Sequence, residues 1–197
     1  MRALAGSLTG IVWLSTIDPA AAHPALQGVS GFYGGLLHPL LVPSHLIAVV
    51  VLGLLIGQQA PHEARAAPVA YIAAVIAGLA AIALAYVPTF AEETLLACAA
   101  LSGLLAALAR PLPQAMVVPL AAATGLSLAL DSPPDAISLA DANRALLGTA
   151  VGAGVLLVLV SEGASRLRRA WQRIGLRIAG SWIAASAILV LALRFAR

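Results

Sequence analysis

The stretch from Gly31 to Gly57 constrains the fold most, because it contains no aspartate, glutamate, lysine or arginine. An apolar run of this length is typical of a transmembrane helix, which needs about 20 such residues. The run nevertheless carries two histidines, His38 and His45, beside the helix-breaking Pro39 and Pro43. Ionisable groups at membrane depth are costly and commonly functional, so the stretch predicts a membrane span with an intramembrane ion site.

The composition extends this prediction to the whole chain. Hydrophobic residues make up 61% of the 197 residues, charged residues make up 10%, and the mean hydropathy is +0.99. Such values exclude a soluble domain and indicate an all-α polytopic membrane protein, a helical bundle rather than a barrel of short alternating strands. We expect about six transmembrane helices, near residues 29–57, 68–88, 92–109, 114–131, 143–161 and 175–195.

The amino terminus has the pattern of an export signal. Arg2 precedes an apolar stretch that ends in an Asp-Pro pair and three alanines. Residues 1–22 are therefore predicted to be a signal peptide, with an uncleaved first span as the alternative, and residues 23–197 a single integral membrane domain. Cleavage would make His23 the first mature residue, whose α-amino group and imidazole can chelate a metal together. The alternative is that His23 only marks the signal junction.

The charged residues separate into two sets along this topology. The net charge is +3, and every basic residue other than histidine is an arginine. Placing the mature amino terminus outside a bacterial inner membrane puts most arginines into cytoplasmic connections, as the positive-inside rule requires. These are Arg65, Arg110, Arg166, Arg168, Arg169, Arg173 and Arg177, whereas Glu92, Glu93, Asp131, Asp135 and Asp141 lie near the outer surface. Arginines beside a span indicate contact with the lipid bilayer and not with nucleic acid.

Two further patterns bear on packing and on partners. Arg166, Arg169, Arg173 and Arg177 recur at helical spacing, which predicts an amphipathic cytoplasmic helix for anionic lipid or a partner protein, or a plain topology anchor. Glycine pairs four residues apart, Gly31 with Gly35 and Gly148 with Gly152, are compatible with close contact between helices. These pairs predict packing and not function.

The spacing of His38 and His45 allows two geometries. On a regular helix, seven residues put both rings on one face but about 10 Å apart along the axis, too far for one metal ion. Pro39 and Pro43 each remove a helical hydrogen-bond donor, so a break between them would fold the rings toward one ion. The alternative is a simple kink, with each imidazole hydrogen-bonded to a neighbouring helix.

Nothing in the sequence indicates an enzyme. The chain has no nucleophile motif, no acid–base pair and no phosphate-binding glycine loop, so any transport would be secondary or channel-like. No organic cofactor is expected. Ligation of haem by the two histidines is a weaker possibility, because nothing else marks a haem pocket.

The histidine segment resembles the first signature of the HupE/UreJ family of membrane proteins. In that signature a Gly-Phe pair precedes His-Pro-x-x-Gly-x-Asp-His-Leu. The layout is also similar to that family, with an export signal before the first His-Pro, six mature spans and a glutamate that opens the third. The matching residues here are Gly31-Phe32, His38-Pro39, His45-Leu46, Gly53-Leu54, Glu92 and Gly103.

The resemblance implies uptake of nickel or cobalt for the maturation of hydrogenase and urease. It implies a secondary transporter or permease for Ni²⁺ or Co²⁺, with metalloenzyme maturation proteins as partners. His38 and His45 would then handle the metal, Glu92 would receive the entering cation, and His23 would assist capture. For Glu92, a favourable interaction with the amino terminus of its own helix is the alternative role.

The sequence departs from the family pattern at several positions. Val42 replaces the glycine of the signature, and Ser44 replaces the aspartate, which removes a carboxylate from the ligand set. The stretch from Pro119 to Asp131, where a second and histidine-rich signature is expected, contains no histidine. Nickel and cobalt sites favour several imidazole and carboxylate ligands. The departures therefore favour an alternative, a membrane accessory protein with the same fold that no longer transports metal.

Overall fold

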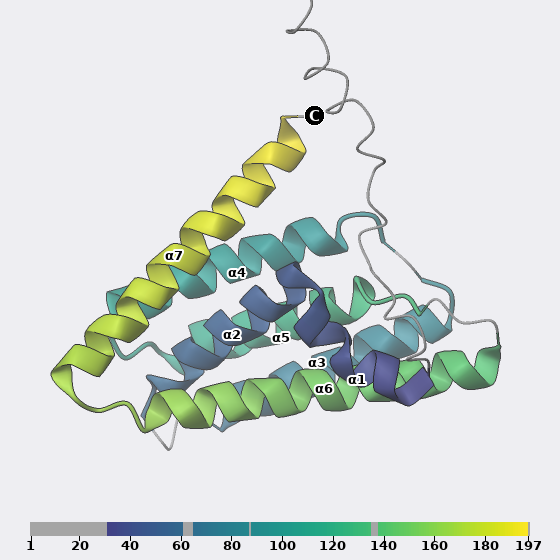
Figure 1. Ribbon diagram of the computed structural model, residues 1–197, viewed down its shortest axis with the longest axis horizontal. Helices are drawn as coiled ribbons and strands as arrows, with labels where there is room; N and C mark the ends of the chain where they lie inside the picture. Colours follow the sequence, from purple (N-terminus) through teal and green to yellow (C-terminus); the bar gives the residue numbers. More distant parts are fainter. Residues whose placement is uncertain (1–30, 61–64, 87, 135–137, 197) are drawn as a thin grey trace, which may run out of the picture.

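The protein is an all-α bundle (Figure 1). The computed structural model describes residues 31–60, 65–86, 88–134 and 138–196, and these contain seven helices and no strand. The helices are α1 (Gly31–Leu41), α2 (Pro43–Gly57), α3 (Ala66–Ala83), α4 (Ala91–Leu108), α5 (Gln114–Leu130), α6 (Leu139–Ser165) and α7 (Ala170–Phe195). The predicted signal peptide, residues 1–22, lies outside the described residues and stays a prediction.

The helices confirm the predicted membrane bundle but not the count of six spans. Four of them, α3, α4, α6 and α7, are long and apolar enough to cross a membrane. The α1–α2 pair passes the same test as a unit but is bent by 70°, so it adds a fifth span only if both halves form one crossing. The remaining helix, α5, is apolar but has only 17 residues. The described part of the chain thus supports four or five spans.

The bend between α1 and α2 follows from Pro43. A residue that precedes proline is pushed out of the helical region, and Val42 is extended, with φ −88° and ψ 113°. Pro43 then opens α2, at a position where a backbone N–H would have no helical partner. Because Pro43 cannot donate to the carbonyl of Pro39, the hydrogen-bond ladder is interrupted here. Of the two geometries that the sequence allowed, the break is therefore present and the simple kink is wrong.

Glycines hold α1 against α6, and the two helices lie side by side (Figure 1). A Cβ atom added at Gly35 would lie 1.9 Å from the carbonyl oxygen of Ala145, and one at Gly148 would lie 2.0 Å from that of Phe32. Gly152 is equally close to the α1 backbone. These three positions confirm the close contact that the glycine spacing predicted. They fix the short helix α1, and with it His38, at one end of the bundle.

The central helix of the bundle is α2, which contacts α1, α4, α5, α6 and α7. It is apolar on every side, as expected of a helix that is enclosed by others. Its buried apolar residues include Ala48, Val49, Val51, Leu52, Leu55 and Ile56. The first turn of this helix carries His45, whose side chain is 0% exposed.

The charged residues lie at two ends of the bundle, and the contacts between the antiparallel helices α4 and α7 mark both ends. Arg194 in the last turn of α7 reaches Glu92 at the start of α4, while Arg177 reaches Ala107 at the other end of α4. We call the two groups the acidic end and the arginine end. The acidic end holds Glu92, Glu93, Asp131 and Asp141, and the arginine end holds Arg65, Arg110, Arg166, Arg168, Arg169, Arg173 and Arg177.

The regularly spaced arginines do not form a helix of their own. Helix α6 continues to Ser165, and α7 begins at Ala170. Arg166 and Arg169 lie in the connection, whereas Arg173 and Arg177 belong to the first turns of α7. A separate amphipathic helix, one of the two interpretations of this spacing, is therefore wrong, because the two long helices leave only a short link. The other interpretation, a topology anchor, stays a prediction.

Candidate functional site

The two histidines face each other across the break between α1 and α2. Their ring centroids are 5.0 Å apart, and the ring planes meet at 67°. His38 lies near the end of α1 and is half-buried, whereas His45 is enclosed in the first turn of α2. The bend at Val42 thus replaces the spacing of about 10 Å that a regular helix would impose.

The ring separation fits two imidazoles on one metal ion. With metal–nitrogen bonds of about 2.0–2.1 Å, two such rings have centroids roughly 5 Å apart. No group of three or more His, Cys, Asp or Glu side chains in the described ranges is arranged to hold a metal. The pair therefore offers two imidazole ligands, and an ion bound there would need water or backbone carbonyls to complete its coordination.

Asp131 holds His45, although the sequence did not place this aspartate in the site. Nε2 of His45 and Oδ2 of Asp131 are hydrogen-bonded over 2.9 Å, between α2 and the end of α5. The other ring nitrogen, Nδ1, is buried and has no hydrogen-bond partner among the residues that the structure describes. The sequence allows ring pairing and a hydrogen bond to a neighbouring helix as alternatives. His45 makes both, since it contacts the ring of His38 and bonds Asp131. An ionisable residue that closes a predicted span was the available signal for Asp131.

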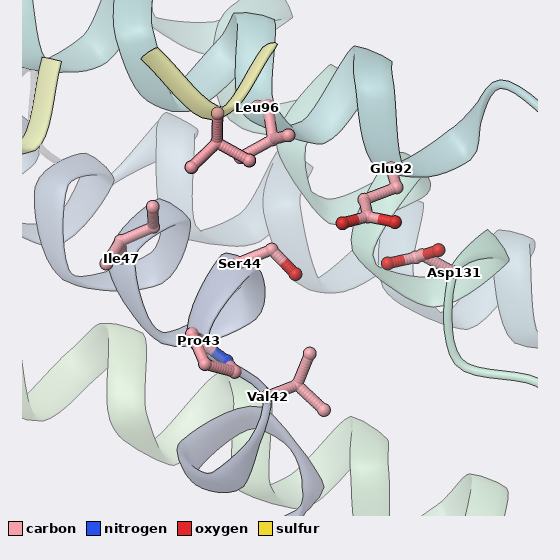
Figure 2. A pocket seen from close by; sticks show the side chains of 8 residues that line it. Val42, Pro43, Ser44, Ile47, Glu92, Leu96 and Asp131 are labelled. Carbon is pink, nitrogen blue, oxygen red and sulfur yellow. The ribbon is translucent and has the colours of Figure 1, made fainter. Parts of the chain in front are cut away.

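A cavity of about 210 Å³ lies beside Asp131, the residue that contacts His45, although neither histidine lines it. Figure 2 shows the carboxylates of Glu92 and Asp131 facing each other from α4 and the end of α5. The hydroxyl of Ser44 points toward them from the start of α2. The other lining residues are apolar, namely Val42, Pro43, Ile47, Leu96 and Val190. The cavity therefore has one polar side, where oxygen atoms from three helices converge.

Glu92 is already paired with an arginine. Arg194 forms an ion pair with Glu92, and its Nη1 also lies 3.4 Å from Oε1 of Glu93. The side chains of Glu92 and Arg194 are 25% and 40% exposed, so solvent reaches both. Glu92 also lies in the first turn of α4, where a carboxylate interacts favourably with the helix dipole. Glu92 therefore lies both at the amino terminus of its helix and on the wall of the cavity. The sequence does not predict its ion pair with Arg194.

The structure brings two of the four predicted site residues into contact. His38 and His45 are in ring contact, whereas Glu92 lines a neighbouring cavity with Asp131, the residue that contacts His45. The fourth, His23, lies outside the described residues.

The comparison with known families decides the relationship. The family described as HupE / UreJ protein matches residues 11–190 of the chain. The chain belongs to the HupE/UreJ family. No curated protein and no solved structure matches it. Membership supports a membrane accessory protein associated with nickel or cobalt, in a family of accessory and transport proteins rather than enzymes.

In this HupE/UreJ protein a carboxylate contacts His45 although the aspartate of the signature is absent. Ser44 stands where the signature has an aspartate, so the carboxylate next in sequence to His45 is missing. Asp131 supplies a carboxylate to the same histidine from another helix. The site therefore retains an imidazole–carboxylate pair that is assembled by the fold.

Proposed function

We propose that this HupE/UreJ protein is a secondary permease that moves Ni²⁺ or Co²⁺ across a bacterial inner membrane. The proposal rests on the His38–His45 pair, which the break in the α1–α2 span brings to a centroid distance of 5.0 Å. Imidazole suits nickel and related divalent ions. Broken membrane helices whose ends surround an ion site are typical of secondary transporters.

A site with only two imidazoles suits an ion in transit. Conduction needs binding that is favourable enough for entry and weak enough for release. The carboxylates of Glu92 and Asp131 beside the cavity would raise the local concentration of cations. With the mature amino terminus outside, His23 would assist capture on the side where these carboxylates lie.

Uptake by reconstituted vesicles tests the permease. We expect saturable uptake of Ni²⁺ or Co²⁺ by the full chain and a loss of at least about tenfold in the His38→Ala, His45→Ala double variant, because metal ligands are removed. A His62→Ala variant is the matched control, since this histidine falls between the first two predicted spans. Uptake that the double variant leaves unchanged contradicts the proposal.

A second candidate is an accessory membrane protein that does not transport. The lack of a three-residue metal cluster in the described part of the chain favours it, as does the absence of histidine from Pro119 to Asp131. Metalloenzyme maturation proteins would then bind the arginine end. The expected result is a partner captured from detergent extracts that is lost when Arg166, Arg168 and Arg169 are neutralised, together with no metal uptake. Partner capture that ignores these arginines contradicts this candidate.

A further inference from the structure

The two ring nitrogens of His45 lie in different surroundings. Nε2 is bonded to the Asp131 carboxylate, whereas Nδ1 is buried without a hydrogen-bond partner in the described chain. Burial of a polar atom without a partner costs roughly 1–3 kcal/mol. A fully enclosed histidine that tolerates this cost on one nitrogen and satisfies the other has the arrangement of a ligand held by a carboxylate.

The Asp131 carboxylate interacts unfavourably with the dipole of its own helix, α5. Asp131 is the C-cap residue of α5, where the helix dipole places partial negative charge, so a carboxylate there is unfavourable. The same carboxylate meets the first turn of α2, the positive end of another helix, through His45. Asp131 is therefore matched electrostatically to α2 and its histidine and not to α5.

The end of α5 is held firmly by its own hydrogen bonds. The backbone N–H of Asp131 donates to the carbonyl of Ser127 over 3.0 Å. The hydroxyl of Ser132, next in sequence, donates to the carbonyl of Leu128 over 2.6 Å. Only 18% of the Asp131 side chain is exposed. The carboxylate is consequently presented to His45 from a defined backbone position.

The hydrogen bond selects one form of the His45 ring. An ionised carboxylate can only accept, so the proton of the bond belongs to Nε2 of the imidazole. In a neutral imidazole the lone pair then lies on the opposite nitrogen. We propose that Asp131 is the positioning residue of the metal path, holding His45 in the tautomer whose Nδ1 is the metal-binding atom. This inference rests on the proposed metal-handling function and adds the residue that orients its ligand.

The nitrogen NMR spectrum of the His45 ring tests the tautomer without any metal. With the full chain labelled in detergent, we expect Nε2 to carry the proton and Nδ1 to show the shift of an unprotonated nitrogen. His45→Ala assigns the signals. In Asp131→Asn the amide can donate as well as accept, so the Nδ1–H tautomer should appear. Asp141→Asn is the matched control, because this carboxylate also lies at the acidic end but bonds Ser138 and Arg144.

A ring protonated on Nδ1 in the unaltered chain overturns the inference. A tautomer that Asp131→Asn leaves unchanged overturns it as well, since the carboxylate would then not select it. Neither outcome depends on whether the protein binds a metal.

Binding of Co²⁺ or Ni²⁺ to the purified full chain supplies the second readout. We expect Asp131→Asn to weaken binding by roughly 10- to 100-fold and to alter the visible spectrum of bound Co²⁺. Asp131→Glu should restore part of the affinity, because it keeps the acceptor charge. Asp141→Asn should bind as the unaltered chain does.

The outcomes separate this inference from the proposed function. Binding that His45→Ala abolishes but Asp131→Asn spares, with an unchanged Co²⁺ spectrum, overturns the role of Asp131 and leaves the permease standing. A chain that binds neither ion overturns the permease, and the role of Asp131 as positioning residue of a metal path falls with it. The ring spectrum then shows only whether Asp131 sets the tautomer.

Discussion

The acidic end and the arginine end differ in how their charges are partnered. At the acidic end two ion pairs join residues far apart in sequence, His45 with Asp131 and Arg194 with Glu92, beside a local pair of Asp141 with Arg144. At the arginine end the ion pair is local, since Arg166 pairs with Glu162 one helical turn away, over 3.5 Å, and Arg177 reaches a distant backbone carbonyl, that of Ala107. Both side chains of the Arg166–Glu162 pair are largely exposed. The acidic end is therefore an assembled site, while the arginine end is mainly a solvated surface.

This difference separates two uses of charge in one membrane protein. Exposed arginines can orient a chain in the membrane without fixed partners, because the positive-inside rule depends on the number of arginines near the spans and not on their geometry. A site that handles an ion needs fixed partners from several elements, so its residues must be delivered by the fold. Matched substitutions at the two ends should consequently give unequal effects.

The largest effect is expected from alanine substitutions of two glycines on α6. Gly148→Ala should lower the free energy of unfolding by about 1–3 kcal/mol or more, because its Cβ would meet the carbonyl oxygen of Phe32 at 2.0 Å. Gly163→Ala, at the other end of the same helix, has no neighbouring atom within 4 Å. It should raise stability by about 0.5–1 kcal/mol, since alanine favours the helix.

Unfolding of both variants in mixed detergent micelles, followed by circular dichroism, measures the two changes. Equal stability of Gly148→Ala and the unaltered chain would show that α1 is not held against α6. The position of His38 would then have another cause.

Much of this architecture could be predicted from local sequence. The length of the apolar stretches predicted the all-α membrane bundle, and the prolines predicted an irregular segment, which is the break that Pro43 produces at Val42. Glycine spacing predicted close contact between helices, but not that α1 and α6 would be the pair. The predicted features depend on residues within a few turns of one another, whereas the pairing of α1 with α6 joins distant segments. The number of spans was not settled in this way, because the bent α1–α2 pair and the short helix α5 depart from a regular crossing.

The partners at the site could not be predicted in the same way. His45 and Asp131 are 86 positions apart, and Arg194 and Glu92 are 102 apart. Their contacts require that α5 lies beside α2 and that α7 runs antiparallel to α4. Hydrophobic periodicity does not specify which helices are neighbours. The sequence therefore predicted a site with both histidines and Glu92, and it placed neither Asp131 nor Arg194 beside them.

A smaller effect is expected from removing one glutamate at each end. Glu92→Gln should lower uptake of Ni²⁺ several-fold at low ionic strength, because Arg194 would keep only Glu93 as a partner and would repel cations at the cavity. Glu162→Gln removes the partner of Arg166 at the opposite end and should leave uptake unchanged. Initial uptake rates at low and high salt check both, and the Glu92 effect should shrink as salt screens the charges. Equal rates for the two variants would contradict a role of the acidic cavity in entry.

The smallest effect is expected from neutralising the connection between α6 and α7. The Arg166→Gln, Arg168→Gln, Arg169→Gln triple variant should keep its affinity for Co²⁺ within about twofold. These exposed side chains lie at the arginine end, and α2, with 15 residues, spans roughly 22 Å between the two ends. That distance exceeds twice the Debye length of about 8 Å at physiological ionic strength.

Measuring the affinity in detergent separates binding from orientation. Neutralised arginines can change the orientation of the chain in a membrane and hence its uptake, but orientation has no meaning in a micelle. A loss of Co²⁺ affinity as large as that of Asp131→Asn would mean that the two ends are coupled through α2. The arginine end would then be part of the metal site, and the contrast between an assembled end and a solvated end would fail.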